Sequence, residues 1–348
     1  MTPTPVEPRE AALARPALPW TLPEGYDRHD PGPAELQAAL DLTAGRLDWR
    51  PLSWTGLVEG LLRVGVTDIT LGRLVEGHVD ALRILDQAGA EPHAGARYGV
   101  WASRSAGTGI AARVEGATLR LNGTIRFASG AGVIDRALVP VWSDPETHLL
   151  VDLAVDDLPV DRSHWTTAAM RVSQSHTVTV ADLVVDASDV VGEPSFYLGR
   201  PGFLPGGVGV AAVWAGGLTR VLDVTVAMLD GRRVTEAQDA RLGRARLHLI
   251  AALTAVRAAG SRLDELWPAR AESSTAPLIT EVVTESRALV AHAVTAALAE
   301  LRILAGPAGL AFDPDLGHAL DDLGLYAAQL NVDAEATRLG SALRSRRV

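Results

Sequence analysis

The chain has 348 residues, 47% of them hydrophobic, with a formal net charge of −10 and no cysteine. The acidic balance argues against a nucleic-acid partner, which needs a basic face, and the lack of cysteine excludes disulfides, thiolate metal ligands and cysteine nucleophiles. The nine histidines show neither H-x-x-x-H nor H-E-x-x-H spacing, so we expect no metal site.

The first residues carry Glu7, Arg9 and Glu10 where a signal peptide has its apolar core. No run reaches the roughly 18 apolar residues of a membrane span, so we expect a cytoplasmic protein that does not enter a membrane. Prolines are dense over residues 1–34. This density disfavours regular structure and predicts a flexible tail, or an arm that wraps a neighbour.

A short N-terminal helical domain is predicted over residues 35–95. Short helices are expected over 34–43 and 54–64. A longer helix begins where Asp68 or Thr70 can cap its first turn, and its apolar residues fall on one face. It ends at Gly89, a residue type that favours helix C-termini.

Residues 96–200 are predicted to form a β-domain. A strand over 98–101 leads into a loop of small residues over 102–109. The pair Asn122-Gly123 is a strong hairpin signal between short strands over 117–121 and 124–127. A second small-residue turn over 128–132 and a strand over 136–142 follow. Two such loops next to aromatic residues predict a flat cleft, where N–H groups and hydroxyls meet a ring with polar edges.

Residues 201–348 are predicted to form a helical bundle. Segment 199–207 is a candidate hinge, and long Ala/Leu/Val patterns cover about 208–230, 235–265, 276–305 and 318–345. Four long helices with short joints are typical of an up-down four-helix bundle. The predicted class is therefore α+β, with N-terminal helices, a middle β-barrel or sandwich and a C-terminal four-helix bundle.

The order of these segments resembles the acyl-CoA dehydrogenase family. The resemblance rests on the Gly116–Gly123 stretch ending in Leu-Asn-Gly, on Phe127-Ala-Ser-Gly-Ala131, and on the Met-Arg-x-Ser within 161–175. The segment 71–85, LGRLVEGHVDALRIL, looks like a helix of an actinobacterial-type branch. About two thirds of the chain is covered in the family's order. The N-terminal helices are fewer than in the family, so the substrate tunnel is expected to be open, short or completed by another subunit.

The resemblance implies an FAD site in the β-domain. It implies Val100 and Trp101 near the pyrimidine side of the flavin ring, Thr108 near the phosphates, and Phe127 with Ser129 against the ring. One departure is Trp101-Ala-Ser103, where family members often carry Thr-Glu-Pro. The alternative interpretation of both aromatic residues is ordinary packing in the β-core.

In the family a second subunit completes the FAD site. Here Arg232 and Arg233 stand where its adenine-contacting loop should be, without the family's Phe-Gly, and Gly306 and Gly309 stand in an altered glycine turn at the pyrophosphate position. Arginine and free N–H groups suit phosphates. The alternative for the two arginines is a solvated corner between helices.

The catalytic base is the point where the sequence departs most from the family. Leu330 occupies the register of the usual glutamate, and no Asp or Glu occurs between Pro194 and Leu222, the other family location. Asp333 and Glu335 are weak candidates that require a different helix register, so the catalytic residue is unknown.

Two further motifs have structural interpretations. Glu76 and His78 resemble an acid/base pair, but residues two apart point away from each other on a helix, so one is expected at the surface and the other packed. Trp214 is expected in the core or at a subunit interface.

The resemblance implies FAD-dependent α,β-desaturation of an acyl thioester, with electrons passed to a carrier flavoprotein. The missing base leaves three alternatives. The first is a flavin-dependent oxidase or monooxygenase of the same fold. The second is a catalytically silent subunit that completes the FAD site of an active homologue, and the third is a scaffold that binds no flavin. A homodimer or homotetramer through the bundle is expected, or a hetero-oligomer with a homologue.

Overall fold

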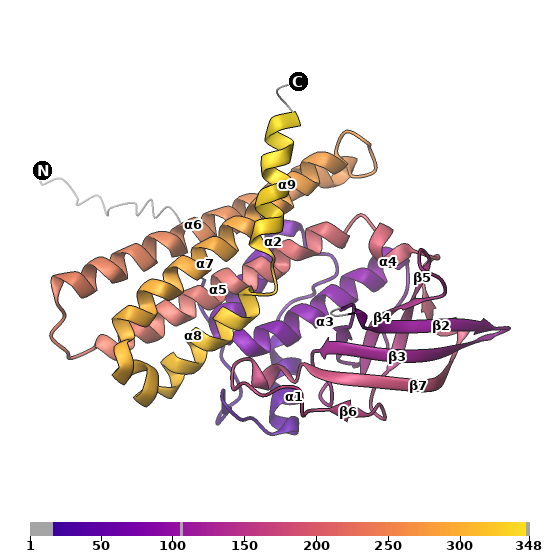
Figure 1. The fold of residues 1–348 in the computed structure, drawn as a ribbon, viewed down its shortest axis with the longest axis horizontal. Helices are drawn as coiled ribbons and strands as arrows, with labels where there is room; N and C mark the ends of the chain where they lie inside the picture. Colours follow the sequence, from indigo (N-terminus) through magenta and orange to yellow (C-terminus); the bar gives the residue numbers. More distant parts are fainter. Residues whose placement is uncertain (1–16, 105–106, 346–348) are drawn as a thin grey trace, which may run out of the picture.

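The computed structural model describes residues 17–104 and 107–345. Figure 1 shows three parts: N-terminal helices, a β-sheet at one end, and long helices that lie side by side at the other. Residues 1–16 of the predicted arm lie outside the described residues. The following residues pack on their own chain, since the Trp20 N–H donates to Thr67 Oγ1 at 2.7 Å and Arg28 pairs with Asp68 at 3.2 Å.

The N-terminal helices form as the sequence predicts. They are α1 Pro33–Ala44, α2 Trp54–Thr67 and α3 Ile69–Ala88. Asp68 caps α3, because its side chain accepts hydrogen bonds from the N–H groups of Thr70 and Leu71. Gly89 ends the helix with φ 68°, the left-handed conformation that favours glycine.

Within the described residues, eight strands form one sheet in the order β6-β7-β3-β2-β4-β5-β8, with β1 paired to β4. The strands are β1 Tyr98–Val100, β2 Gly109–Glu115, β3 Thr118–Ala128, β4 Arg136–Trp142, β5 His148–Ala154, β6 Val160–Asp161, β7 His176–Asp186 and β8 Val190–Val191. The loops that follow β1 and β3 face α3, so the sheet presents its small-residue loops to the N-terminal helices (Figure 1).

The predicted hairpin at Asn122-Gly123 is wrong. The chain turns earlier, at Gly116-Ala117, so that β2 pairs with β3 from Glu115–Thr118 to Gly109–Thr124. Because β3 is paired on both sides, with β2 and β7, this pairing overrides the local turn signal. Asn122 instead sits at an irregularity opposite Asp182, whose N–H donates to the Asn122 side chain at 2.8 Å. Gly123 is required there because a Cβ would overlap the carbonyl oxygen of Gly109.

The C-terminal half is helical. Its elements are α4 Phe196–Gly199, α5 Phe203–Leu229, α6 Glu236–Leu266, α7 Ala276–Phe312, α8 Pro314–Ala327 and α9 Val332–Ser345. The predicted hinge over 199–207 is largely the start of α5, and the fourth predicted pattern divides into α8 and α9. Inside α7 the backbone breaks at Gly306, with φ 60° and ψ −177°.

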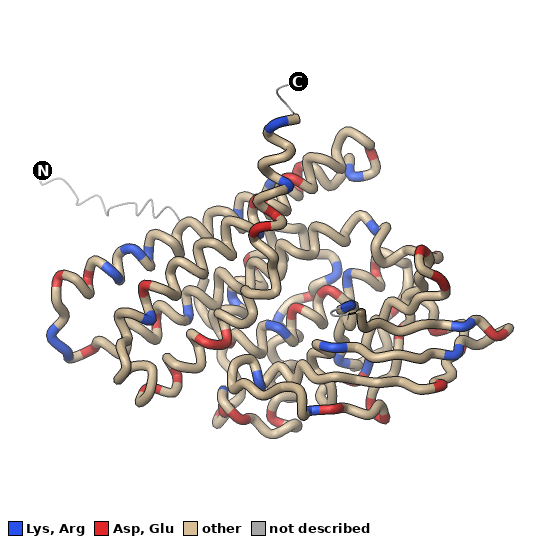
Figure 2. The backbone as a smooth tube through the Cα atoms, viewed as in Figure 1, with Lys and Arg blue, Asp and Glu red and all other residues tan. Residues whose placement is uncertain are grey.

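Helix α5 is the central helix of this half. It packs against α2, α3, α6, α7 and α8. It carries only Arg220 and Asp223 as charged residues, whereas charges spread over the outer helices (Figure 2). α5 and α7 are long and apolar enough to cross a membrane by length and composition, and 67% of the apolar 18-residue stretch of α5 and 50% of that of α7 are buried. For α5, packing on five neighbouring helices accounts for the apolar composition.

α2 and α5 approach each other through glycines. A Cβ on Gly65 would overlap the Val213 carbonyl oxygen, and a Cβ on Gly216 would overlap the Leu62 carbonyl oxygen. The two backbones are therefore in direct contact, and any side chain at either glycine forces the helices apart. We call this contact the glycine seam.

Candidate functional site

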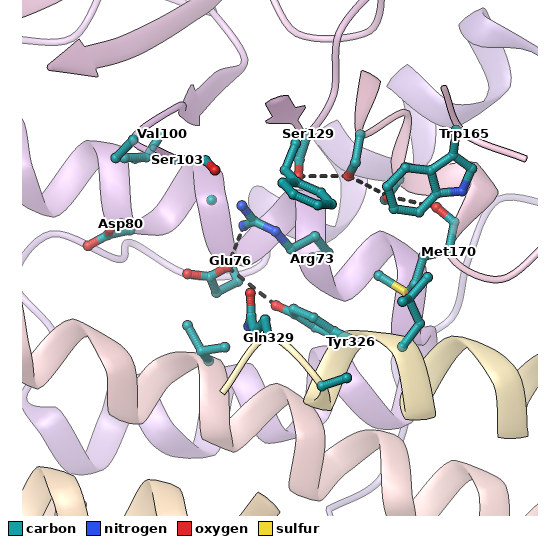
Figure 3. A pocket seen from close by; sticks show the side chains of 18 of the residues that line it. Arg73, Glu76, Asp80, Val100, Ser103, Ser129, Trp165, Met170, Tyr326 and Gln329 are labelled. Carbon is teal, nitrogen blue, oxygen red and sulfur yellow. Dashed lines mark hydrogen bonds and ion pairs between the residues drawn. The ribbon is translucent and has the colours of Figure 1, made fainter. Parts of the chain in front are cut away.

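A cavity of about 570 Å³ lies between α3, the loops after β1 and β3, and the C-terminal end of α8 (Figure 3). Its size is that of a small-molecule or cofactor site. The apolar part of the lining includes Val100, Phe127, Trp165, Met170, Val210 and Leu325.

An aromatic wall stands on the sheet side. Phe127 has φ 59°, a conformation that bulky residues rarely adopt, and its side chain is 52% exposed. Its ring meets Trp165 edge to face, with centroids 6.3 Å apart. Strained residues of this kind concentrate at functional sites. A half-exposed aromatic pair facing a cavity is a surface that a planar ring can cover.

A chain of three serine hydroxyls follows the same wall. Ser173 Oγ donates to the Met170 carbonyl at 2.7 Å, and Ser175 Oγ lies 2.7 Å from Ser173 and 2.8 Å from Ser129. A carbonyl can only accept, so the Ser173 proton is used there, Ser175 donates to Ser173, and Ser129 donates to Ser175. Ser129 thus presents only lone pairs to the cavity, as an acceptor for a ligand N–H or O–H.

The opposite wall carries a buried ion pair. Arg73 Nη1 lies 2.6 Å from Glu76 Oε2, and the Tyr326 hydroxyl donates to the same oxygen at 3.4 Å (Figure 3). Glu76 is 7% exposed. Burial raises the pKa of Glu76, and the Arg73 guanidinium opposes that shift. Trp214, expected in the core or at a subunit interface, is fully buried in α5 and packs edge to face on Tyr326 with centroids 6.0 Å apart, so it belongs to the core of its own chain.

A second carboxylate, Asp80, lies one turn further along α3. Arg200 Nη2 is 3.4 Å from Asp80 Oδ1, and the Arg200 guanidinium lies over the rings of Tyr197 and Phe203 at 5.1 and 5.7 Å. Each carboxylate of this wall therefore has its own guanidinium, and the wall is close to neutral.

Several predicted flavin residues come together in the cavity. Val100, Phe127 and Ser129 line it. Trp101 lies behind the wall, 2% exposed, and its Nε1–H donates to the Ser129 carbonyl at 2.9 Å, so its side chain supports Ser129. Thr108 precedes β2 and does not belong to the lining.

The residues predicted to act from a second subunit lie elsewhere in the chain. Arg232 and Arg233 are exposed between α5 and α6, and Gly306 and Gly309 belong to the bent part of α7. In Figure 1 both segments lie at the end of the long helices farthest from the sheet.

The weak base candidates do not face the cavity. Leu330 is buried outside its lining, and Asp333 is exposed. Glu335 is buried but pairs with Arg338 at 2.9 Å. The nearest cavity residue in this segment is Gln329.

The charged wall was missed by sequence reasoning. Its signal was present, because Arg73, Glu76 and Asp80 are spaced i, i+3 and i+7, which places three charged residues on one side of an apolar helix. Glu76 and His78 indeed diverge. His78 accepts a hydrogen bond from the Tyr98 N–H at 3.0 Å, and burial lowers its pKa to about 4. Glu76 is buried and His78 is not exposed, so the expectation that one of the two lies at the surface is wrong.

Asp322 of α8 accepts hydrogen bonds from two other segments of the chain, next to the cavity residue Met170. It accepts the Met170 N–H at 2.5 Å and the Thr70 hydroxyl at 3.1 Å. Burial raises its pKa to about 6. Because the folded state binds this proton more tightly than the unfolded chain, the stability contributed by protonated Asp322 is lost as pH rises from about 4 to about 6.

Asp322→Asn should therefore stabilise the protein at pH 7, by roughly 1 to 3 kcal/mol. The amide oxygen still accepts the Met170 N–H, and the amide group carries no charge. Urea unfolding between pH 4 and 7.5 should show the advantage shrinking towards pH 4. Asp321→Asn is the matched control, because this exposed neighbour forms only a surface ion pair with Arg302. An Asp322→Asn advantage that is the same at every pH would contradict the assignment.

Comparison with solved structures identifies the fold. Dibenzothiophene monooxygenase TdsC from Paenibacillus is 18% identical over 90% of each chain, with a TM-score of 0.74, and its FMN-bound form gives 0.75. XiaF from Streptomyces, solved with FADH2, is 19% identical over 92% of this chain and 89% of its own, with a TM-score of 0.72. Methanesulfinate monooxygenase MsuC from Pseudomonas fluorescens is 15% identical over 90% of each chain, with a TM-score of 0.75.

No protein-family model matches the chain, and no curated protein matches its sequence. The likeness to solved structures confirms the predicted fold class, an acyl-CoA dehydrogenase-like α+β fold with N-terminal helices, a central sheet and a C-terminal helical domain. The same fold carries flavin-dependent monooxygenases.

Proposed function

We propose that the protein is a flavin-dependent monooxygenase that holds its flavin ring in the cavity between α3, the sheet and α8. The observation that carries this proposal is the strained, half-exposed Phe127 ring beside the serine chain that ends at Ser129. Support comes from the fold, which this chain shares with proteins solved with FMN and with FADH2.

The residues present fit a flavin ring. Phe127 offers an aromatic face, and Ser129 offers an acceptor for an N–H at the ring edge. The Trp101 indole fixes the Ser129 backbone from behind. When bound and reduced, a flavin supplies the electrons that activate molecular oxygen. The chain's own contribution is to position the ring and to surround it with apolar side chains that exclude water.

Oxygen chemistry is favoured over acyl-thioester desaturation by the charges of the cavity. Desaturation needs a carboxylate base, and Leu330, Asp333 and Glu335 do not supply one there. Glu76 is nevertheless a carboxylate in the cavity, so acyl-thioester dehydrogenation remains the second candidate.

In this proposal, whether the protein binds FAD or FMN depends on whether a second subunit contributes to the site. Arg232, Arg233, Gly306 and Gly309 lie apart from the cavity in their own chain, so they would serve FAD only from a second copy or from a homologue. FMN needs no such contribution.

The test begins with flavin binding by the purified chain, measured for FAD and FMN in oxidised and reduced form. Protein loaded with reduced flavin is then mixed with ¹⁸O₂ and with indole or dibenzothiophene as probe substrates. We expect one labelled oxygen atom in the product. A parallel anaerobic titration with acyl-CoA thioesters should leave oxidised flavin unbleached.

Bleaching by a thioester without oxygen would contradict the monooxygenase proposal and support the dehydrogenase. Failure to bind either flavin in either redox state would contradict both candidates and leave the silent subunit or the scaffold.

A further inference from the structure

We propose that Glu76 recognises the substrate, and that the cavity selects a neutral planar ligand with an N–H or O–H group that donates a hydrogen bond to Glu76 Oε1. This inference rests on the proposed function and names the substrate class of the same site. The sequence reasoning assigned Glu76 no such role.

One oxygen of the Glu76 carboxylate is left for a ligand. Arg73 and Tyr326 both bind Oε2. Among the residues that the structure describes, no hydrogen bond to Oε1 is found, although Glu76 is more than nine-tenths buried and lines the cavity. This oxygen is open to the cavity and has no protein partner, so it can accept a hydrogen bond from a ligand N–H or O–H.

The paired charges of this wall determine the charge of the ligand it suits. Arg73 neutralises Glu76, and Arg200 faces Asp80. A cationic ligand would find no unmatched carboxylate on this wall, and an anionic ligand would find no unmatched guanidinium. The wall therefore suits a neutral molecule.

The other lining residues determine the shape of the ligand. With Phe127 facing the flavin ring, the surfaces that remain are the Trp165 ring and the side chains of Met170, Val210 and Leu325. Figure 3 shows Trp165 and Met170 on one side of the cavity, with Glu76 and Tyr326 across from Ser129. Apolar and aromatic surface combined with one acceptor fits an aromatic ring system that carries a single donor at its edge.

The experiment compares three probes of similar size. Indole and 3-methylindole keep the N–H, whereas 1-methylindole replaces it with a methyl group. The dissociation constants are measured by calorimetry on the full chain, with and without saturating FMN. We expect indole and 3-methylindole to bind about tenfold more tightly than 1-methylindole. Because 3-methylindole carries the same extra methyl group, the comparison separates the hydrogen bond from size.

Glu76→Gln tests the role of Glu76 as a hydrogen-bond acceptor without leaving Arg73 unpaired. Arg73 attracts the amide oxygen, so the amide NH₂ turns to the cavity and cannot accept. The preference for N–H probes should disappear in this variant. Glu59→Gln makes the same change at the ion pair with Arg257, outside the cavity, and should keep the preference.

The pH dependence gives a second readout. Protonation removes the charge of Glu76, so indole affinity should fall as pH drops through a pKa that burial raises above the usual glutamate range, while Glu76→Gln stays flat. The ionisable groups that act on Glu76 are Arg73 and Asp80 on α3, Tyr197 on α4, Arg287 on α7 and Tyr326 on α8.

Equal affinity for all three probes, or no binding of any of them, would overturn the inference. A failure of the proposed function is a different result. It appears as absent flavin binding or absent oxygen transfer, independently of how the three probes rank in affinity.

Discussion

Replacing Ser129 by phenylalanine is expected to abolish flavin binding. Ser129 lies in the cavity wall with its hydroxyl 2.8 Å from Ser175 and its carbonyl fixed by Trp101, so a phenyl group has no room behind the wall. It must project into the space proposed for the flavin ring, and affinity should fall by about a hundredfold or more. Fluorescence titration with FMN and FAD measures the loss.

Two control variants distinguish a loss of the flavin site from a general loss of folding. Ser129→Ala removes the acceptor without adding volume and should weaken flavin binding by only about three- to tenfold. Ser188→Phe places the same ring at an exposed turn after β7 and should leave binding intact. Unchanged flavin affinity in a folded Ser129→Phe protein would show that the ring is held elsewhere.

Gly216→Ala is expected to destabilise the protein by about 3 kcal/mol or more. At the glycine seam the new methyl group meets the Leu62 carbonyl oxygen, which belongs to a helix backbone and cannot rotate away as a side chain would. The helices must separate, and packing along α2 and α5 is lost. Urea unfolding measures the free energy.

Gly243→Ala is the matched control. This glycine is exposed in α6 with open space around it, so the same substitution should stabilise the helix by about 0.5 to 1 kcal/mol. A Gly216→Ala protein as stable as the wild type would mean that the two helices are farther apart than the glycine seam requires.

Local signals predicted much of the fold. The Asp68 cap, the Gly89 stop and the long helical patterns of the C-terminal half act within a few residues, so they can be read along the chain. The Asn122-Gly123 signal is equally local, but β3 is paired on both sides, and that pairing is not visible in any short window. β2 was missed for the same reason.

The candidate site was predicted on one wall only. Val100, Phe127 and Ser129 lie close in sequence to recognisable small-residue loops, so a resemblance could locate them. Glu76 faces them from another element, and Tyr326 joins Glu76 across 250 residues of chain. No spacing rule connects such distant residues, although the charged stripe on α3 marked Glu76 as unusual for an apolar helix.

The glycine seam limits the routes by which a ligand can reach the cavity. α3 continues directly from α2, and α5 continues from α4, which carries Tyr197 of the cavity. Since α2 and α5 touch backbone to backbone, they cannot part to admit a ligand without breaking the closest contact between them. The segment 162–167, largely exposed and carrying Trp165, is not held in this way. We therefore expect segment 162–167 to move when a ligand enters the cavity, while α2 and α5 keep their positions.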